Sequence, residues 1–109
     1  MARPHLSDDG QTVTLDLHGA HVDEAIRLVE AVVVQAARYG RPTLKIVHGT
    51  STADLGHRRT IKDELRDRLD TGEYDRHVTS SYLTDGAMTL GLAPAPRPIQ
   101  GHLRLSDLA

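Results

Sequence analysis

Two short apolar stretches, each ending in a histidine and then a glycine, constrain the fold of this chain most strongly. Residues 12–18 alternate apolar and polar side chains, which predicts a strand with one buried face. Residues 43–48 have the β-branched content of a second strand. Between them, apolar residues recur at helical spacing over residues 22–39. The sequence therefore predicts a β-α-β unit, whose right-handed crossover leaves the two strands parallel.

The C-terminal ends of these two strands carry the candidate catalytic residues. His18 ends the first strand, His48 ends the second, and Asp16 shares a face of the first strand with His18. Because parallel strands end at the same edge of a sheet, we expect the two histidines to lie close together. Two imidazoles beside one carboxylate are suited to acid-base chemistry on a phosphodiester. The alternative for each residue is structural, as a polar strand end or a simple turn.

The rest of the chain predicts an α/β protein built as an α+β two-layer sandwich. Residues 59–70 predict a second helix, and residues 77–82 and 87–92 predict a terminal hairpin. The expected order is β-α-β-α-β-β, giving a mixed four-stranded sheet with two helices on one face. We expect three regions. Residues 1–11 form a flexible N-terminal lead, residues 12–92 form the folded domain, and residues 93–109 form a proline-rich linker with a C-terminal tail.

Composition narrows the function classes. The chain of 109 residues contains no cysteine, which removes thiol nucleophiles, thiolate metal sites and redox switches. No segment has the apolar length of a membrane span or of a signal peptide, so we expect a cytoplasmic protein without a membrane partner. The formal net charge of −2 argues against binding nucleic acid by bulk charge alone. With no Phe, no Trp and three Tyr, the chain lacks the aromatic platforms that stack on single strands.

Positive charge is instead concentrated on either side of the second predicted strand. Three cationic residues surround its start, Arg38, Arg41 and Lys45, and three more follow His48, Arg58, Arg59 and Lys62. Together they form a local basic strip that suits phosphates, and the alternative is an ordinary solvated surface of mixed sign. The residues we predict to bind nucleic acid are Lys45, Gly49, Thr50, Ser51, Arg58 and Arg59.

Three motifs resemble the Smr, or small MutS-related, domain family. They are Leu15-Asp16-Leu17-His18-Gly19, Val22-Asp23-Glu24-Ala25 and Val47-His48-Gly49, and the resemblance spans roughly residues 12 to 92. The chain departs from the family pattern at Ser51, where a glycine is usual, and at His57, where a leucine is usual. The resemblance implies an endonuclease-type nucleic-acid-binding module, in a family with DNA-nicking and RNA-cleaving members. It also matches Arg58 to an arginine of the family pattern.

The expected function is cleavage of phosphodiester bonds in DNA or RNA. His18 and His48 would exchange protons with the substrate, Asp16 would orient one imidazole, and Arg58 would stabilise the developing phosphate charge. The residues are compatible with assistance from Mg²⁺ or Mn²⁺ and also with cleavage without a metal ion. Two alternatives to this function stay open. The first is a nucleic-acid-binding module with weak or no catalytic activity. The second is a protein-interaction domain whose partner binds the C-terminal tail.

Overall fold

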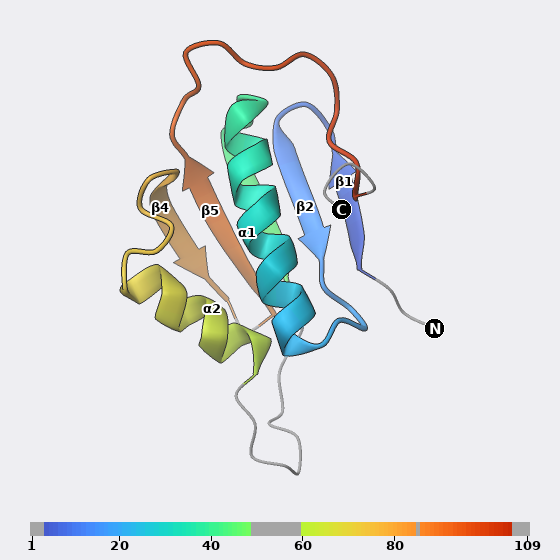
Figure 1. The fold of residues 1–109 in the computed structure, drawn as a ribbon, viewed down its shortest axis with the longest axis vertical. Coiled ribbons are helices and arrows are strands. Elements are labelled where there is room, and N and C mark those ends of the chain that lie inside the picture. Colours follow the sequence, from blue (N-terminus) through green and yellow to red (C-terminus); the bar gives the residue numbers. More distant parts are fainter. Residues whose placement is uncertain (1–3, 49–59, 85, 106–109) are drawn as a thin grey trace.

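The chain forms a mixed sheet with two helices. The structure, a computed structural model, describes residues 4–48, 60–84 and 86–105. Its elements are β1 (His5–Asp8), β2 (Thr12–Asp16), α1 (Val22–Arg38), β3 (Thr43–Val47), α2 (Ile61–Asp70), β4 (Val78–Leu83) and β5 (Ala87–Leu92). The strand order is β1-β2-β3-β5-β4, with α1 crossing in front of the sheet and α2 beside its N-terminal half (Figure 1). The β2–β3 pair is parallel and the other pairs are antiparallel. The expected mixed sheet with two helices is confirmed.

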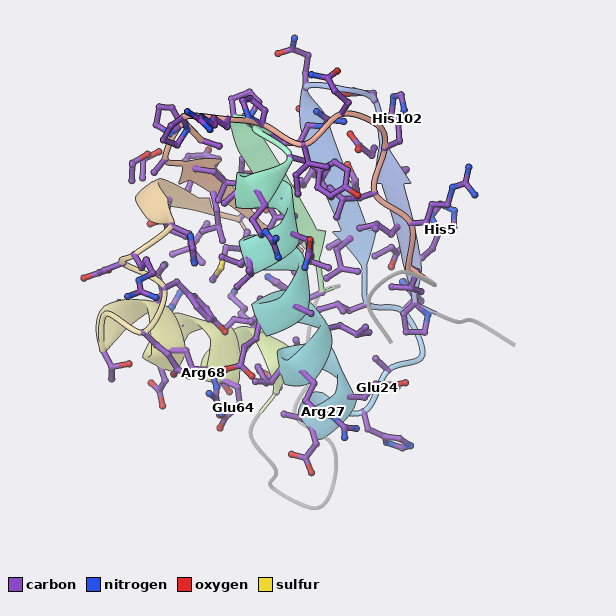
Figure 2. The ribbon with its side chains drawn as sticks, turned by 45° about the horizontal axis from the view of Figure 1, so that its top comes forward. His5, Glu24, Arg27, Glu64, Arg68 and His102 are labelled. Atoms are coloured by element: carbon purple, nitrogen blue, oxygen red, sulfur yellow. The ribbon has the colours of Figure 1, made fainter. Side chains whose placement is uncertain are left out.

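The two helices begin and end where local chemistry favours it. The stripe of α1 that faces the sheet is apolar and buried, and the acidic residues Asp23 and Glu24 occupy its positively polarised first turn. A capping box starts α2, because the side chains of Thr60 and Asp63 each accept a hydrogen bond from the main-chain N–H of the other. Arg68 of α2 (Figure 2) lies with its Nη1 atom 2.9 Å from Oε1 of Glu73, just after α2, and 3.8 Å from Oε2 of Glu30 of α1. The Arg68–Glu30 pair joins the two helices at the surface.

Alternation along the strands gives the sheet one buried face and one open face. The inward side chains are completely buried and form one core cluster with residues of α1 and α2, namely Val13, Leu15, Leu44, Ile46, Met88 and Leu90. The side chains between them point to the opposite face, where none of the described strand residues is buried. The sheet therefore has a helix-covered side and a solvated side, which is the arrangement of a two-layer sandwich.

The expectation of a four-stranded sheet is wrong, because β1 adds a fifth strand at the edge. Residues His5–Asp8 pair antiparallel with β2, placing Leu6 opposite Leu15 and Asp8 opposite Val13. Four residues with one apolar side chain carry too little periodicity to predict a strand, so the sequence predicts a flexible lead over this stretch. Tertiary contacts supply what the local pattern lacks. Leu6 packs against the core, and Asp8 is bound by side-chain and main-chain donors.

A buried ion pair, which we call the Asp8–Arg41 clamp, joins β1 to the turn before β3. Arg41 Nε donates to Asp8 Oδ1 at 2.7 Å and Nη2 donates to Oδ2 at 3.0 Å, and the Asp8 side chain is 1% exposed. The main-chain N–H groups of Gly10 and Leu103 also donate to this carboxylate. Burial acts to raise the pKa of Asp8, but the hydrogen bonds from Arg41, Leu103 and Gly10 outweigh it and lower the pKa overall. Arg41 is therefore engaged in the fold and not in a phosphate-binding strip.

The segment after β5 returns to the domain and packs beside α1. Leu103 is 5% exposed and belongs to the core cluster. The main-chain N–H of Ile99 donates to the carbonyl of Arg38 at 3.0 Å, and Arg41 donates to the carbonyl of Gly101. Figure 1 shows this segment passing over the C-terminal end of α1 and down towards β1. Its described part is thus bound to the domain. The division of the chain at residue 92 stays a prediction.

Gly40 is the position where the returning segment approaches the backbone most closely. Its φ is +75°, and a Cβ there would lie 2.7 Å from Cβ of Pro98. We expect Gly40→Ala to lower the free energy of unfolding by about 2 to 4 kcal/mol, from the left-handed conformation and from overpacking. Gly10→Ala is the control, because φ is +92° at Gly10 and no atom lies within 4 Å of its built Cβ. Urea denaturation measures both variants. Equal losses of unfolding free energy in the two variants would show that Pro98 moves aside at no cost in stability.

Candidate active site

The C-terminal ends of β2 and β3 lie side by side at one edge of the sheet. Asp16, the last residue of β2, is in register with Val47, the last residue of β3. The main-chain N–H of Leu17 donates to the carbonyl of Val47 at 2.9 Å, which extends the pairing by one residue. His18 follows two residues after β2 and His48 one residue after β3. The crossover therefore brings both histidines to the same edge.

Asp16 and His18 contact each other directly. Asp16 Oδ1 lies 3.3 Å from His18 Nδ1 and accepts a hydrogen bond of 2.9 Å from the main-chain N–H of His18. The His18 side chain is 66% exposed and the Asp16 side chain is 40% exposed. Gly19 follows with a φ of 82°, which turns the chain from the strand towards α1. The carboxylate therefore positions the imidazole at the surface, where a polymer can reach it.

His48 is held through its main chain at the neighbouring strand end. Its N–H donates to the carbonyl of Gly86 at 3.0 Å, and the residue is half-buried. Gly86 immediately precedes β5, whose first residue Ala87 is in register with Val47. The backbone of His48 is thus tied to the start of β5. His21 forms the N-cap of α1 without a side-chain capping hydrogen bond.

Of the predicted nucleic-acid-binding residues, Lys45 lies within the described part of the chain. It is exposed, and it is in register with Thr14 of β2 and Thr89 of β5. Because side chains alternate along a strand, Lys45 shares the open face with Asp16, which is two residues further along the neighbouring strand. The other predicted binding residues lie outside the described residues, namely Gly49, Thr50, Ser51, Arg58 and Arg59.

A row of polar side chains crosses the open face, and the sequence did not indicate it. One residue of each strand is in register, which gives the open-face row Ser7, Thr14, Lys45, Thr89 and Tyr82. The Tyr82 residue is 68% exposed, whereas Tyr74 is 4% exposed and burial raises its pKa to about 12. Period-2 alternation in β2 and β3 is the signal that predicts an outward face. The predicted hairpin indicates that β5 pairs with β4, but no such signal places β5 next to β3, which is what adds Tyr82 to the row.

Two kinds of feature are absent from residues 4–48, 60–84 and 86–105. No group of three or more histidine, cysteine or acidic side chains is placed there to hold a metal ion. No described helix has the length and apolar character needed to cross a membrane.

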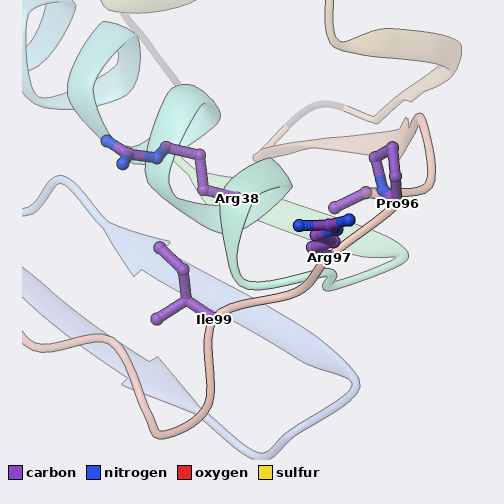
Figure 3. Close-up of a pocket in the computed structure, with 5 residues that line it drawn as sticks. Arg38, Pro96, Arg97 and Ile99 are labelled. Carbon is purple, nitrogen blue, oxygen red and sulfur yellow. The ribbon is translucent and has the colours of Figure 1, made fainter.

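A shallow hollow lies where the returning segment passes the C-terminal end of α1, lined by Arg38, Ala95, Pro96, Arg97 and Ile99 (Figure 3). The histidines of the candidate site follow the other ends of β2 and β3, away from this hollow.

The fold and this site together define a small two-layer domain with a histidine and carboxylate pair at the end of parallel strands. The Smr domain family matches residues 15–87, which include both strand ends and both helices. The chain therefore belongs to the Smr domain family, which is a nucleic-acid-binding, nuclease-like family. Neither the comparison with curated proteins nor the comparison with solved structures finds a match.

Proposed function

We propose that this Smr domain is an endonuclease that cleaves phosphodiester bonds of DNA or RNA by histidine acid-base chemistry. The observation that carries the proposal is the contact between Asp16 and His18, beside the end of the adjacent strand, which His48 follows. A carboxylate beside one imidazole, with a second imidazole one strand away, supplies groups that can accept and donate a proton. The open face beside them suits a polymer better than a small molecule, which needs an enclosed pocket.

His18 is the proposed general base. Its Nδ1 faces the Asp16 carboxylate at 3.3 Å, which favours the tautomer with the proton on Nδ1 and leaves Nε2 to accept one. On RNA, Nε2 takes the proton of the 2′-hydroxyl as that oxygen attacks phosphorus. The bond from phosphorus to the 5′-oxygen breaks, and this oxygen takes a proton from His48. On DNA, a water molecule loses its proton to the same base as its oxygen attacks phosphorus, a phosphorus–oxygen ester bond breaks, and the leaving oxygen takes a proton from His48.

Positive charge completes the proposed site. The negative charge that develops on the phosphate oxygens in the transition state needs cationic or hydrogen-bonding partners. Lys45 lies on the same face as Asp16 and supplies one such charge. Arg58 and Arg59 are proposed for the same role on the strength of the sequence. Because the cationic side chains of the site pair with phosphates, we expect binding to weaken as the salt concentration rises.

Asp16→Asn is expected to lower the cleavage rate by about 10- to 100-fold, which is less than the ~10²- to 10⁴-fold contribution of a group that transfers the proton itself. The variant keeps a side-chain oxygen for the hydrogen bond from the His18 main chain but loses the charge that steadies a protonated imidazole. Single-turnover cleavage measures the effect. Asp23→Asn is the matched control, since it removes a carboxylate from an exposed position in the first turn of α1. A wild-type rate for Asp16→Asn would remove Asp16 from the mechanism.

The whole proposal is tested by incubating the purified chain with single- and double-stranded DNA and RNA. Each substrate is tested with Mg²⁺, with Mn²⁺ and with EDTA. We expect at least one substrate to be cleaved by the wild type, and we expect its binding to fall as salt is raised. Binding to these substrates with no cleavage under any condition would contradict the endonuclease proposal. The protein would then be a nucleic-acid-binding module.

A further inference from the structure

The open-face row is the strongest feature outside the candidate active site. It crosses all five strands on the side of the sheet that carries no helix, and none of its members is buried. Lys45 lies in the middle of the row and the exposed ring of Tyr82 lies at one end. The composition predicts a chain without aromatic platforms for single strands, and Tyr82 is the one aromatic side chain that the described strands place on this face. A single aromatic ring stands on a polar, solvated surface.

We infer that the open face binds a single-stranded nucleic acid, with Tyr82 stacked on an unpaired base and Lys45 paired with a phosphate. The inference rests on the proposed function and adds the form of the substrate. A base can stack on a tyrosine ring only when its own face is free, which holds for single strands and loops and not for a continuous duplex. Tyr82 therefore selects unpaired nucleotides.

The middle of the open-face row carries a positive charge, which suits a phosphate. The charged or titratable side chains that the described strands place on this face are His5, Asp16, Lys45 and Tyr82. Lys45 supplies a positive charge at the centre of the row, and Asp16 contacts His18 at the edge. The other members of the row are hydroxyl residues, Ser7, Thr14 and Thr89. Hydroxyl groups donate hydrogen bonds to phosphate oxygens and to sugars without adding repulsion.

Strand spacing connects this surface to the candidate active site. Neighbouring strands lie about 4.8 Å apart, so Tyr82 and Lys45, two strands apart, are separated by about 10 Å. Asp16 lies one strand beyond Lys45 and two residues along, which is a further ~8 Å. A single-stranded nucleic acid that stacks on Tyr82 and passes over Lys45 therefore leads towards Asp16 and His18. The open face thus guides the nucleic acid to the residues that we propose to be catalytic.

The first test compares the binding of short labelled oligo(dT) and oligo(U) by fluorescence anisotropy. His48→Ala is used as the background for every variant, so that cleavage does not consume the probe. We expect Tyr82→Ala to weaken binding about tenfold or more, and Tyr82→Phe, which keeps the ring, to bind within about twofold of its parent. Ser81→Ala is the control, because Ser81 is exposed next to Tyr82 but is in register with the inward-facing Leu90. Unchanged binding by Tyr82→Ala would overturn the inference.

A second measurement reports stacking directly. The chain contains no tryptophan, so Tyr82→Trp introduces a single indole whose emission is quenched when a base stacks on it. We expect quenching that saturates at the same oligonucleotide concentration as the anisotropy change, and no quenching by a blunt duplex. An unchanged emission, or tighter binding of the duplex than of the single strand, would overturn the inference. Because Tyr82 is 68% exposed, these substitutions leave the core intact, which urea denaturation checks.

The outcomes separate this inference from the proposed endonuclease activity. Quenching and weakened binding, together with no cleavage by the wild type on any substrate, would support the binding surface and remove the nuclease proposal. Cleavage by the wild type, together with unchanged binding by Tyr82→Ala, would keep the nuclease and remove the binding surface. The binding measurements depend on Tyr82, whereas the cleavage assay depends on Asp16, His18 and His48.

Discussion

His48→Ala is expected to lower the rate of phosphodiester cleavage by about two to four orders of magnitude. That range is the usual contribution of one positioned acid or base, and the variant removes one of the two imidazoles proposed to transfer protons. The fold should persist, because the main-chain hydrogen bond from residue 48 to Gly86 does not need the side chain. Single-turnover rates on the best substrate measure the activity, and urea denaturation measures the free energy of unfolding, which we expect to change by about 1 kcal/mol.

His102→Ala is the matched control for this experiment. His102 is an exposed histidine on the segment after β5 (Figure 2), so its removal changes the same chemical group outside the candidate site. We expect its cleavage rate to equal that of the wild type. If folded His48→Ala protein cleaved as fast as the wild type, the assignment of His48 as a proton donor would be wrong. A large loss in both variants would instead point to a shared effect on binding.

Asp8→Asn is expected to lower the free energy of unfolding by about 3 to 5 kcal/mol, a large fraction of the stability of a small domain. The change keeps the shape of the side chain but leaves the guanidinium of Arg41, 11% exposed, without its counter-charge. It also weakens the acceptor for the main-chain N–H groups of Gly10 and Leu103. Glu73→Gln is the control, because the Arg68–Glu73 pair is exposed and such pairs contribute about 0 to 1 kcal/mol.

The same carboxylate predicts how stability depends on pH. The pKa of Asp8 is lowered in the folded protein, since the hydrogen bonds from Arg41, Leu103 and Gly10 outweigh the effect of burial. A group with a depressed folded pKa stabilises the protein above its unfolded pKa, near 3.8, and this contribution is lost as the pH falls through the folded pKa. We expect Asp8→Asn to remove part of the acid dependence of unfolding. An identical slope in the variant below pH ~4 would contradict this.

Periodicity in the sequence predicts the central part of the fold well. The alternating Val13, Leu15 pattern and the apolar stripe of α1 are strong local signals, and the structure contains both elements close to the expected residues. The sequence also predicts that Asp16 and His18 lie close together. In the structure β2 ends at Asp16, and the contact is made in the turn that follows, where the Asp16 carboxylate accepts a hydrogen bond from the His18 main chain. The Smr family match is confirmed over residues 15–87. The catalytic roles of these residues stay predictions.

The features that the sequence does not predict depend on contacts between distant segments. β1 has one apolar residue and is stabilised by Arg41, which lies 33 residues away from Asp8 along the chain. The same arginine looks like a phosphate ligand when it is seen only among its neighbours in the sequence. Tyr82 shares the open face with Lys45 because β5 lies between β3 and β4, and strand order is not encoded in local periodicity. Such features require the tertiary fold.

The Asp8–Arg41 clamp makes the outer edge of the sheet dependent on distant parts of the chain. Asp8 is separated by 33 residues from its Arg41 partner and by 95 residues from the Leu103 N–H group that completes its hydrogen bonds. Contacts between such distant residues carry a larger loop-closure entropy than contacts within a β-α-β unit. The strand pair that carries the two histidines is therefore specified more locally than the edge strand that β1 adds to it.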